Sequence, residues 1–223
     1  MENEIQKAKQ WITNSDALLI GASNGLSIAE GYHIFANNEM FRRQFGDFQQ
    51  KYGILNVIQG CFYQYPTDDD RKEFFVRLVK YWITDYKPSQ VMKDLRRVVG
   101  DKPYFIITSN GDTHLELSGF DPKKVFEIEG TFANTLGGVD DKNPQLQEFL
   151  KQYSNKQLVI LELGIGMRNT LIKQPLMQLA AQLQNSHYIT MNLARELYIP
   201  QQIADRSIGL KGDIAETLHE LDK

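Results

Sequence analysis

Five short, mainly apolar runs, separated by longer amphipathic stretches, constrain the fold of this chain more than any other feature. They cover residues 17–20, 104–108, 125–128, 158–163 and 187–191. Runs of this length that are apolar on both faces and closed by turn residues are typical of strands buried inside a parallel sheet. Their alternation with helical segments predicts a doubly wound, Rossmann-like α/β fold.

The residues that follow these runs share a character. Four of the five runs end in loops of Gly, Ser or Asn, and the remaining run is followed by Glu129-Gly130. The carboxyl ends of parallel strands meet at one edge of an open sheet, where ligands bind. The sequence therefore predicts a ligand site built from these loops.

The loop after the first run, residues 22–27, reads Ala-Ser-Asn-Gly-Leu-Ser, and a helix is expected to open within residues 28–31. A strand, a small-residue turn and a helix start can together hold a pyrophosphate. Backbone N–H groups then point at the anion, and the helix dipole adds partial positive charge. The same pattern also occurs in tight turns that bind nothing, so both interpretations stay open for this loop taken alone.

A long stretch between the first two runs has no strand pattern. Aromatic residues recur every three to four positions over 41–52 and again over 74–83, which predicts amphipathic helices whose aromatic faces form a core. The acidic residues 68–70 fit the first turn of a helix. We expect residues 41–100 to form an inserted helical module that lies over the strand ends and forms one wall of the site.

Composition excludes several classes of protein. The chain has 223 residues, with 25 basic and 28 acidic side chains and a net charge of −3, so it lacks the basic field of a nucleic-acid-binding protein. The sequence has no apolar run long enough for a membrane helix, and because its first ten residues are mainly polar we do not expect them to be a secretory signal. The single cysteine, Cys61, excludes an internal disulfide and a zinc site with several thiolates. We expect a cytoplasmic protein without metal, nucleic acid or membrane partners, and its oligomeric state stays open.

Several loop segments match the motifs of one family in order and spacing. Residues 23–27 (Ser-Asn-Gly-Leu-Ser) stand where that family has Gly-Ala-Gly-Ile-Ser, and residues 108–112 (Thr-Ser-Asn-Gly-Asp) where it has Thr-Gln-Asn-Ile-Asp. Its later Ala-Gly corresponds to Ser118-Gly119, its Gly-Thr-Ser to residues 164–166, and its terminal Gly-Asp to residues 212–213. In these segments the chain resembles the sirtuins, which are NAD-dependent deacylases and ADP-ribosyl transferases.

The departures from the family pattern are informative. The catalytic histidine of the family's Glu-x-His-Gly stands here as Glu129, the arginine of the opening motif stands as Ala36, and the four zinc cysteines are absent. A macrodomain-linked microbial branch of sirtuins also lacks the histidine and acts as protein ADP-ribosyl transferases. Residues 25–27, residues 163–168 and the aromatic helical stretch resemble that branch. Whether a macrodomain partner exists is not visible in the sequence.

The resemblance implies that the protein cleaves the nicotinamide–ribose bond of NAD and passes ADP-ribose to a protein acceptor or to water. The alternatives are a regulatory protein that binds NAD or ADP-ribose without turnover, and a residual deacylase. The implied domains are an NAD-binding domain over 1–40 and 101–223, the helical module over 41–100, and a reduced small module without zinc over 131–157.

The resemblance also implies roles for individual residues. Asn110 would position the ribose, Asp112 would hold the carboxamide, and Glu129 would act as a base or stabilise positive charge on the sugar. Asn110 and Asp112 also fit ordinary turn residues, and Glu129 also fits a degenerate position. His114, the histidine nearest a motif, is interpreted as structural. The residues implied to bind NAD are Ala22, Ser23, Asn24, Gly25, Ser27, Phe35, Ser109, Gly164, Ile165, Gly166, Asn192, Gly212 and Asp213.

Overall fold

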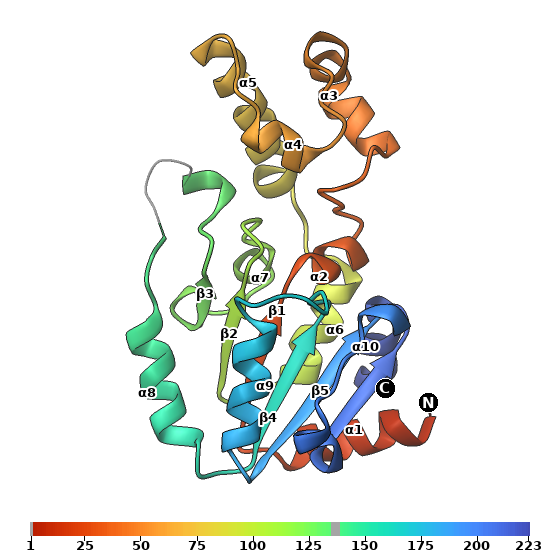
Figure 1. Cartoon of the computed structure of the whole chain (residues 1–223), viewed down its shortest axis with the longest axis vertical. Coiled ribbons are helices and arrows are strands. Elements are labelled where there is room, and N and C mark those ends of the chain that lie inside the picture. Colours follow the sequence, from red (N-terminus) through yellow and green to blue (C-terminus); the bar gives the residue numbers. More distant parts are fainter. Residues whose placement is uncertain (1, 135–138) are drawn as a thin grey trace.

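The computed structural model describes residues 2–134 and 139–223 and confirms the predicted doubly wound α/β fold (Figure 1). Six parallel strands form one sheet in the order β3-β2-β1-β4-β5-β6. From β1 the strands are added outward to β2 and β3 on one side, and from β4 outward to β5 and β6 on the other. The switch point between β1 and β4 is where open sheets of this kind bind ligands. The strands are β1 (Ala17–Ala22), β2 (Tyr104–Thr108), β3 (Val125–Glu127), β4 (Leu158–Leu163), β5 (Ser186–Asn192) and β6 (Ser207–Lys211).

The edge strand β6 was not expected from the sequence. Its residues alternate between more and less buried positions along Ser207–Lys211, and Gly209 stands in its centre. Because only one of its sides pairs with a neighbour, β6 lacks the continuous apolar run that reveals a central strand. The five predicted runs all correspond to strands, and the bounds of β2 and β4 agree with the expected ones.

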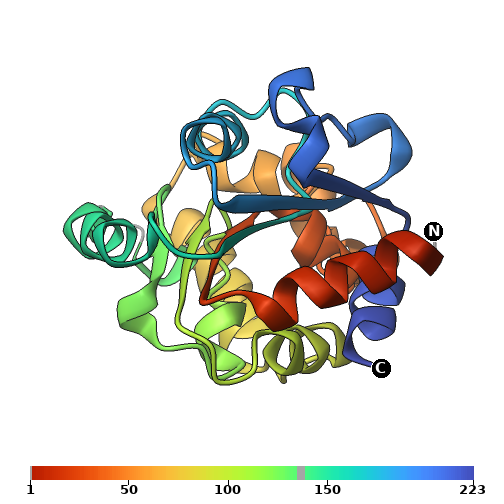
Figure 2. The same cartoon turned by 90° about the horizontal axis from the view of Figure 1, so that it is seen from below.

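Helices cover both faces of the sheet (Figure 2). One face packs against α1 (Glu2–Asn14), α6 (Gln90–Val99) and α10 (Ile214–Asp222), and the other against α8 (Asn143–Tyr153) and α9 (Lys173–Gln182). Alternate residues of β1 enter the two cores, as the pleat requires: Leu18 and Ile20 lie in the first, Ala17 and Leu19 in the second.

A third core lies beyond the carboxyl ends of the strands, in α3 (Glu39–Tyr52), α4 (Val57–Phe62), α5 (Asp68–Val79) and the π-helix η1 (Lys80–Thr84) (Figure 1). We call these four elements the helical module. The aromatic residues of α3 and α5 form its interior, as the sequence predicts. Its buried members include Phe41, Phe45, Phe48, Phe74 and Trp82.

The helix α6 falls inside the range 41–100 expected for the helical module, but it packs on the sheet. Val91, Leu95 and Val99 belong to the same core as α1 and α10, and the last fully buried member of the module's separate core is Trp82. Amphipathic periodicity indicates that a helix has a buried face, and it carries no information about which core receives that face.

The remaining short elements lie in the loops. The helix α2 begins at Asn24, earlier than the expected 28–31, and has only six residues. Part of the range expected for a reduced small module, residues 135–138, lies outside the described residues. No helix that the structure describes is long and apolar enough to cross a membrane. The short elements are α2 (Asn24–Ala29), α7 (His114–Leu117), η2 (Pro122–Lys124), η3 (Phe132–Asn134), η4 (Ala194–Glu196) and η5 (Gln201–Arg206).

Candidate functional site

Two adjoining pockets lie at the carboxyl ends of the strands. The first, of about 540 Å³, is lined by the loops after β1, β4, β5 and β6, and we call it the loop pocket. The second, of about 380 Å³, lies between the loops after β1, β2 and β3 and the helical module, and we call it the module pocket. Asn24 and Phe35 line both pockets. The cleft is therefore at the sheet edge that the sequence predicts.

The structure distributes the expected site residues between the two pockets. Ala22 and Ile165 line neither, because both side chains are fully buried beneath the loops. The expected residues that line the loop pocket are Ser23, Asn24, Gly25, Phe35, Gly164, Gly166, Asn192, Gly212 and Asp213. Those that line the module pocket are Asn24, Ser27, Phe35, Ser109, Asn110, Asp112 and Glu129.

The loops after β1 and β4 touch backbone to backbone at the floor of the loop pocket. The Gly25 N–H donates to the Gly164 carbonyl at 3.0 Å, and the Ser23 N–H donates to the Leu163 carbonyl at 3.2 Å. These two N–H groups are thus already paired, and the six-residue α2 supplies only a short dipole. Arg195, which the sequence analysis did not single out, also lines this pocket, and its Nε lies 3.7 Å from the carboxylate of Glu196, another lining residue.

This contact requires glycine on both sides. A Cβ at Gly25 would lie 2.4 Å from the Gly164 Cα, and Gly164 itself has a φ of +62°. We expect Gly25→Ala to lower the free energy of unfolding by about 1–3 kcal/mol, because the backbones must separate. The measurement is thermal melting. The matched control is Gly46→Ala on α3, where nothing lies within 4 Å of the new Cβ. Equal melting temperatures for the two variants would show that the contact is not tight.

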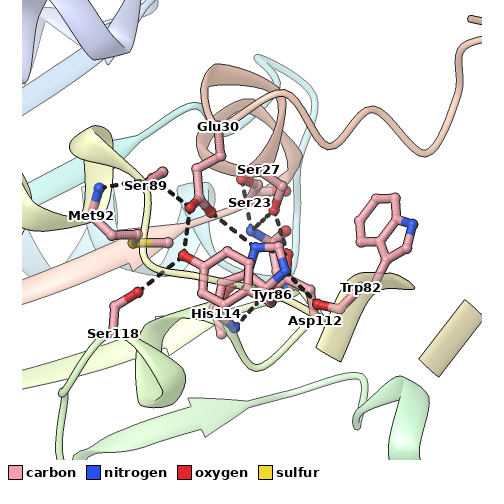
Figure 3. A network of polar contacts seen from close by, with 12 residues as sticks. Ser23, Ser27, Glu30, Trp82, Tyr86, Ser89, Met92, Asp112, His114 and Ser118 are labelled. Atoms are coloured by element: carbon pink, nitrogen blue, oxygen red, sulfur yellow. Dashed lines mark hydrogen bonds and ion pairs between the residues drawn. The ribbon is translucent and has the colours of Figure 1, made fainter. Parts of the chain in front are cut away.

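The floor of the module pocket is a buried polar cluster of Ser27, Asn110 and Asp112. The Ser27 hydroxyl donates to Asp112 Oδ2 at 2.5 Å, and Asn110 Nδ2 donates to the Ser27 Oγ at 2.9 Å and to the Ser23 carbonyl at 3.1 Å. Asp112 Oδ1 accepts from the His114 N–H at 3.1 Å, at the start of α7. Each of these side chains is therefore held in one orientation, and Figure 3 shows Ser27 and Asp112 within this network.

Two buried polar atoms, on residues that line the module pocket, have no hydrogen-bond partner among the described residues. One is Asn110 Oδ1, an acceptor, and the other is Trp82 Nε1, whose N–H is a donor. Buried polar groups are nearly always paired, so each exception needs an explanation. A ligand that offers both a donor and an acceptor would satisfy both atoms.

A tight backbone contact brings the turn that carries Glu129 against the Asn110–Asp112 loop. A Cβ at Gly111 would lie 2.9 Å from the Gly130 carbonyl oxygen, and the Phe132 N–H donates to the Gly111 carbonyl at 2.7 Å. Glu129 itself is exposed at the rim, and its carboxylate makes no hydrogen bond or ion pair with the described residues. Phe35 is half exposed. The rim of the module pocket is therefore open to solvent.

A fully buried pair, Glu30 and His114, lies behind this floor and was not found by sequence reasoning. His114 Nδ1 lies 3.0 Å from Glu30 Oε1, and the ring stacks on Tyr86 with centroids 3.8 Å apart. The sequence does not reveal this pair, because Glu30 follows a short helix and His114, although it is the histidine nearest a motif, stands alone.

A second buried ion pair supports the loop pocket from below. Lys173 Nζ lies 2.6 Å from Glu162 Oε1, and both side chains are fully buried. Thr190 and Tyr188 also donate to the Glu162 carboxylate. Glu162 stands inside an apolar run, where sequence reasoning interprets it only as part of a strand. Among the described residues, no group of three or more His, Cys, Asp or Glu side chains is arranged to hold a metal ion.

Comparison with known proteins places this geometry in context. No protein-family model matches the chain. A protein ADP-ribosyltransferase of Staphylococcus aureus is 25% identical over 262 aligned positions, which cover 92% of this chain and 82% of the relative. A probable bifunctional ADP-ribose hydrolase/ADP-ribosyltransferase of Fusarium oxysporum is 26% identical over 59% of this chain and only 22% of its own length.

Solved structures share the fold across nearly the whole chain. A crystal structure of a Sir2 homologue in complex with NAD matches with a TM-score of 0.60 at 16% identity, covering 97% of this chain and 92% of the other. A sirtuin structure concerned with substrate affinity matches with a TM-score of 0.60 at 15% identity, covering 97% of both chains. A Sir2 structure with a p53 peptide and NAD matches with a TM-score of 0.54 at 13% identity, over 97% of this chain and 96% of the other.

Proposed function

Because the chain has the sirtuin fold and is similar along most of its length to a protein ADP-ribosyltransferase, we propose that it is a sirtuin-like, NAD-dependent ADP-ribosyl transferase. It would cleave the nicotinamide–ribose bond of NAD and pass ADP-ribose to a protein acceptor or to water. The observation that carries the proposal is the buried cluster of Ser27, Asn110 and Asp112, with one acceptor left unpaired.

The two pockets suit the two halves of a dinucleotide. They adjoin at Asn24 and Phe35, so a molecule with two nucleoside ends and a central pyrophosphate can occupy both. The loop pocket would receive the adenosine end and the phosphates. Since the Ser23 and Gly25 N–H groups are already paired, the Arg195 guanidinium at this pocket is the group that would offset the phosphate charge.

The module pocket suits the nicotinamide riboside end. The unpaired Asn110 Oδ1 would accept from a ribose hydroxyl, and the Asp112 carboxylate would accept from the carboxamide N–H. The unpaired Trp82 N–H offers a donor for an amide carbonyl. Because these side chains are already oriented by one another, binding would cost little reorganisation, and the ribose would be presented in one geometry.

In this scheme the protein acts on the reaction mainly through non-covalent contacts and proton transfer. NAD supplies a sugar carbon that becomes electrophilic as nicotinamide leaves. Glu129, exposed at the rim, would meet that carbon from the side on which an acceptor enters. There its carboxylate would stabilise developing positive charge or take the acceptor's proton. A protein acceptor fits the open rim, and sirtuin neighbours include a complex with a peptide.

One observation favours a second candidate function over deacylation. The described residues that line the module pocket include no histidine, which deacylation would need as a base for the ribose hydroxyl. Glu129 in that position fits either ADP-ribosyl transfer or a protein that binds NAD without turnover. A regulatory protein that binds NAD without turnover therefore remains the alternative function, and the lining of the module pocket argues against a deacylase.

The test is to incubate the purified protein with NAD and to follow free nicotinamide, with and without a set of candidate acceptor proteins. Calorimetry measures NAD binding in parallel. We expect binding, nicotinamide release and ADP-ribose on an acceptor or in solution. Asn110→Ala, prepared in the same way, should release at least tenfold less nicotinamide. Binding without release would favour the regulatory protein, and absence of binding would contradict both functions.

A further inference from the structure

The buried pair of Glu30 and His114 connects the helical module to the floor of the module pocket (Figure 3). Glu30 caps the carboxyl end of α2, and His114 begins α7, directly after the loop that carries Asp112. Both side chains are fully buried. None of the roles assigned so far uses either residue.

The hydrogen-bond partners of His114 determine what its ring does. Nε2 lies 2.7 Å from the Trp82 carbonyl oxygen, which can only accept, so Nε2 carries a hydrogen. Nδ1 lies 3.0 Å from Glu30 Oε1, and the other carboxylate oxygen, Oε2, already accepts from Tyr86 and Ser89 at 2.7 Å each. A Glu30 carboxylate that accepts three hydrogen bonds leaves Nδ1 as a donor as well.

The surroundings favour a positive ring. Burial opposes the charge, but the Glu30 hydrogen bond and the nearby Asp112 and Glu30 carboxylates raise the pKa of His114 above its usual range. Asp112 Oδ2 lies 3.8 Å from Nδ1. The Tyr86 ring stacks on the imidazole and the Tyr32 ring meets it edge-on, at 3.8 and 4.5 Å between centroids.

We propose that His114 is a positioning residue of the module pocket: it donates from both ring nitrogens, to Glu30 and to the Trp82 carbonyl, and thereby stabilises the Asp112 carboxylate and holds the helical module against the pocket floor. The proposal rests on the proposed function, because Asp112 matters only if it meets the nicotinamide end of NAD. His114 touches neither NAD nor the reacting atoms in this scheme; it acts through Asp112.

The substitution Glu30→Gln removes the negative charge of this side chain while it keeps the size and the hydrogen-bonding positions. A glutamine can still accept from Tyr86 and Ser89 through its oxygen, while its amide N–H donates to Nδ1 of a neutral His114. Every hydrogen bond is kept and the positive charge beside Asp112 is lost. The matched control is Glu220→Gln on the exposed face of α10. His114→Gln, with His219→Gln as its control, is the second variant.

The first readout is the pH profile of nicotinamide release. Because the pKa of His114 is raised, the charged ring is present at lower pH and is lost as pH rises through that pKa. Wild-type kcat/KM should therefore fall on the alkaline side. In Glu30→Gln this fall should move to lower pH by about one unit or more. In the pH range where His114 is charged in the wild type and neutral in Glu30→Gln, the KM for NAD of the variant should be about tenfold higher while kcat changes less.

The second readout needs no activity. Nitrogen-15 NMR of the NAD-free protein at pH 7 should show both His114 ring nitrogens protonated in the wild type, and one unprotonated in Glu30→Gln. A wild-type ring with one bare nitrogen would overturn the proposal, as would a Glu30→Gln profile that coincides with the Glu220→Gln control. If the wild type neither binds NAD nor releases nicotinamide, the proposed function fails instead, and the spectra identify that case because they still report the charge on His114.

Discussion

Replacing Lys173 by methionine should destabilise the protein by about 3–5 kcal/mol, which is a large part of the 5–15 kcal/mol typical of a folded domain. Lys173 and Glu162 are both fully buried, with 2.6 Å between Nζ and Oε1. Methionine fills most of the volume of the lysine stem but leaves the Glu162 carboxylate without its cation. Thr190 and Tyr188 still donate to it, yet neutral hydroxyls do not replace a charge.

The measurement is urea unfolding of the single variant beside the double variant Glu162→Gln/Lys173→Met. The double variant has no buried charge, and the glutamine oxygen accepts from one of the two hydroxyls while its amide N–H donates to the other. We therefore expect it to recover most of the lost stability. A loss below about 1 kcal/mol in the single variant would show that water or a structural shift replaces the lysine.

The same pair supports the loop pocket. Lys173 Nζ lies 3.5 Å from the Ile165 carbonyl oxygen, which also accepts from Asn192 Nδ2 at 2.9 Å. These contacts hold the Gly164–Gly166 turn from beneath. The fraction of the Lys173→Met variant that is still folded should therefore bind NAD more weakly than the wild type does.

Replacing Glu129 by glutamine should lower nicotinamide release by roughly 10²-fold while NAD affinity stays nearly unchanged. The substitution removes a charge and keeps the size of the side chain. Glu129 is exposed and bonds to no described residue, so the fold loses no contact. A fall in turnover would then report the chemical step and not a disturbed structure.

The measurement is steady-state nicotinamide release, with NAD affinity from calorimetry and Glu148→Gln on the exposed side of α8 as the matched control. If Glu129→Gln keeps or raises the activity, the carboxylate has no catalytic part. The pockets and the NAD proposal would be unaffected by that result.

Local patterns in the sequence determined the scaffold. The apolar runs at 104–108 and 158–163 predicted β2 and β4 with their bounds, because a strand buried on both faces has no polar side of its own. The aromatic spacing over 41–52 predicted the buried face of α3 for a similar reason. The loops that follow the strands predicted the sheet edge at which both pockets lie, since all parallel strands end there.

Only the tertiary structure decided which residues meet. Glu30 reaches His114 across 84 positions, and Asn110 reaches Ser23 across 87, so no local pattern reveals either contact. The same holds for β6, for the docking of α6 on the sheet, and for the close approach of Gly25 to Gly164. Periodicity reports the faces of one element, whereas a buried charge or a backbone contact depends on what a distant segment brings to the same point.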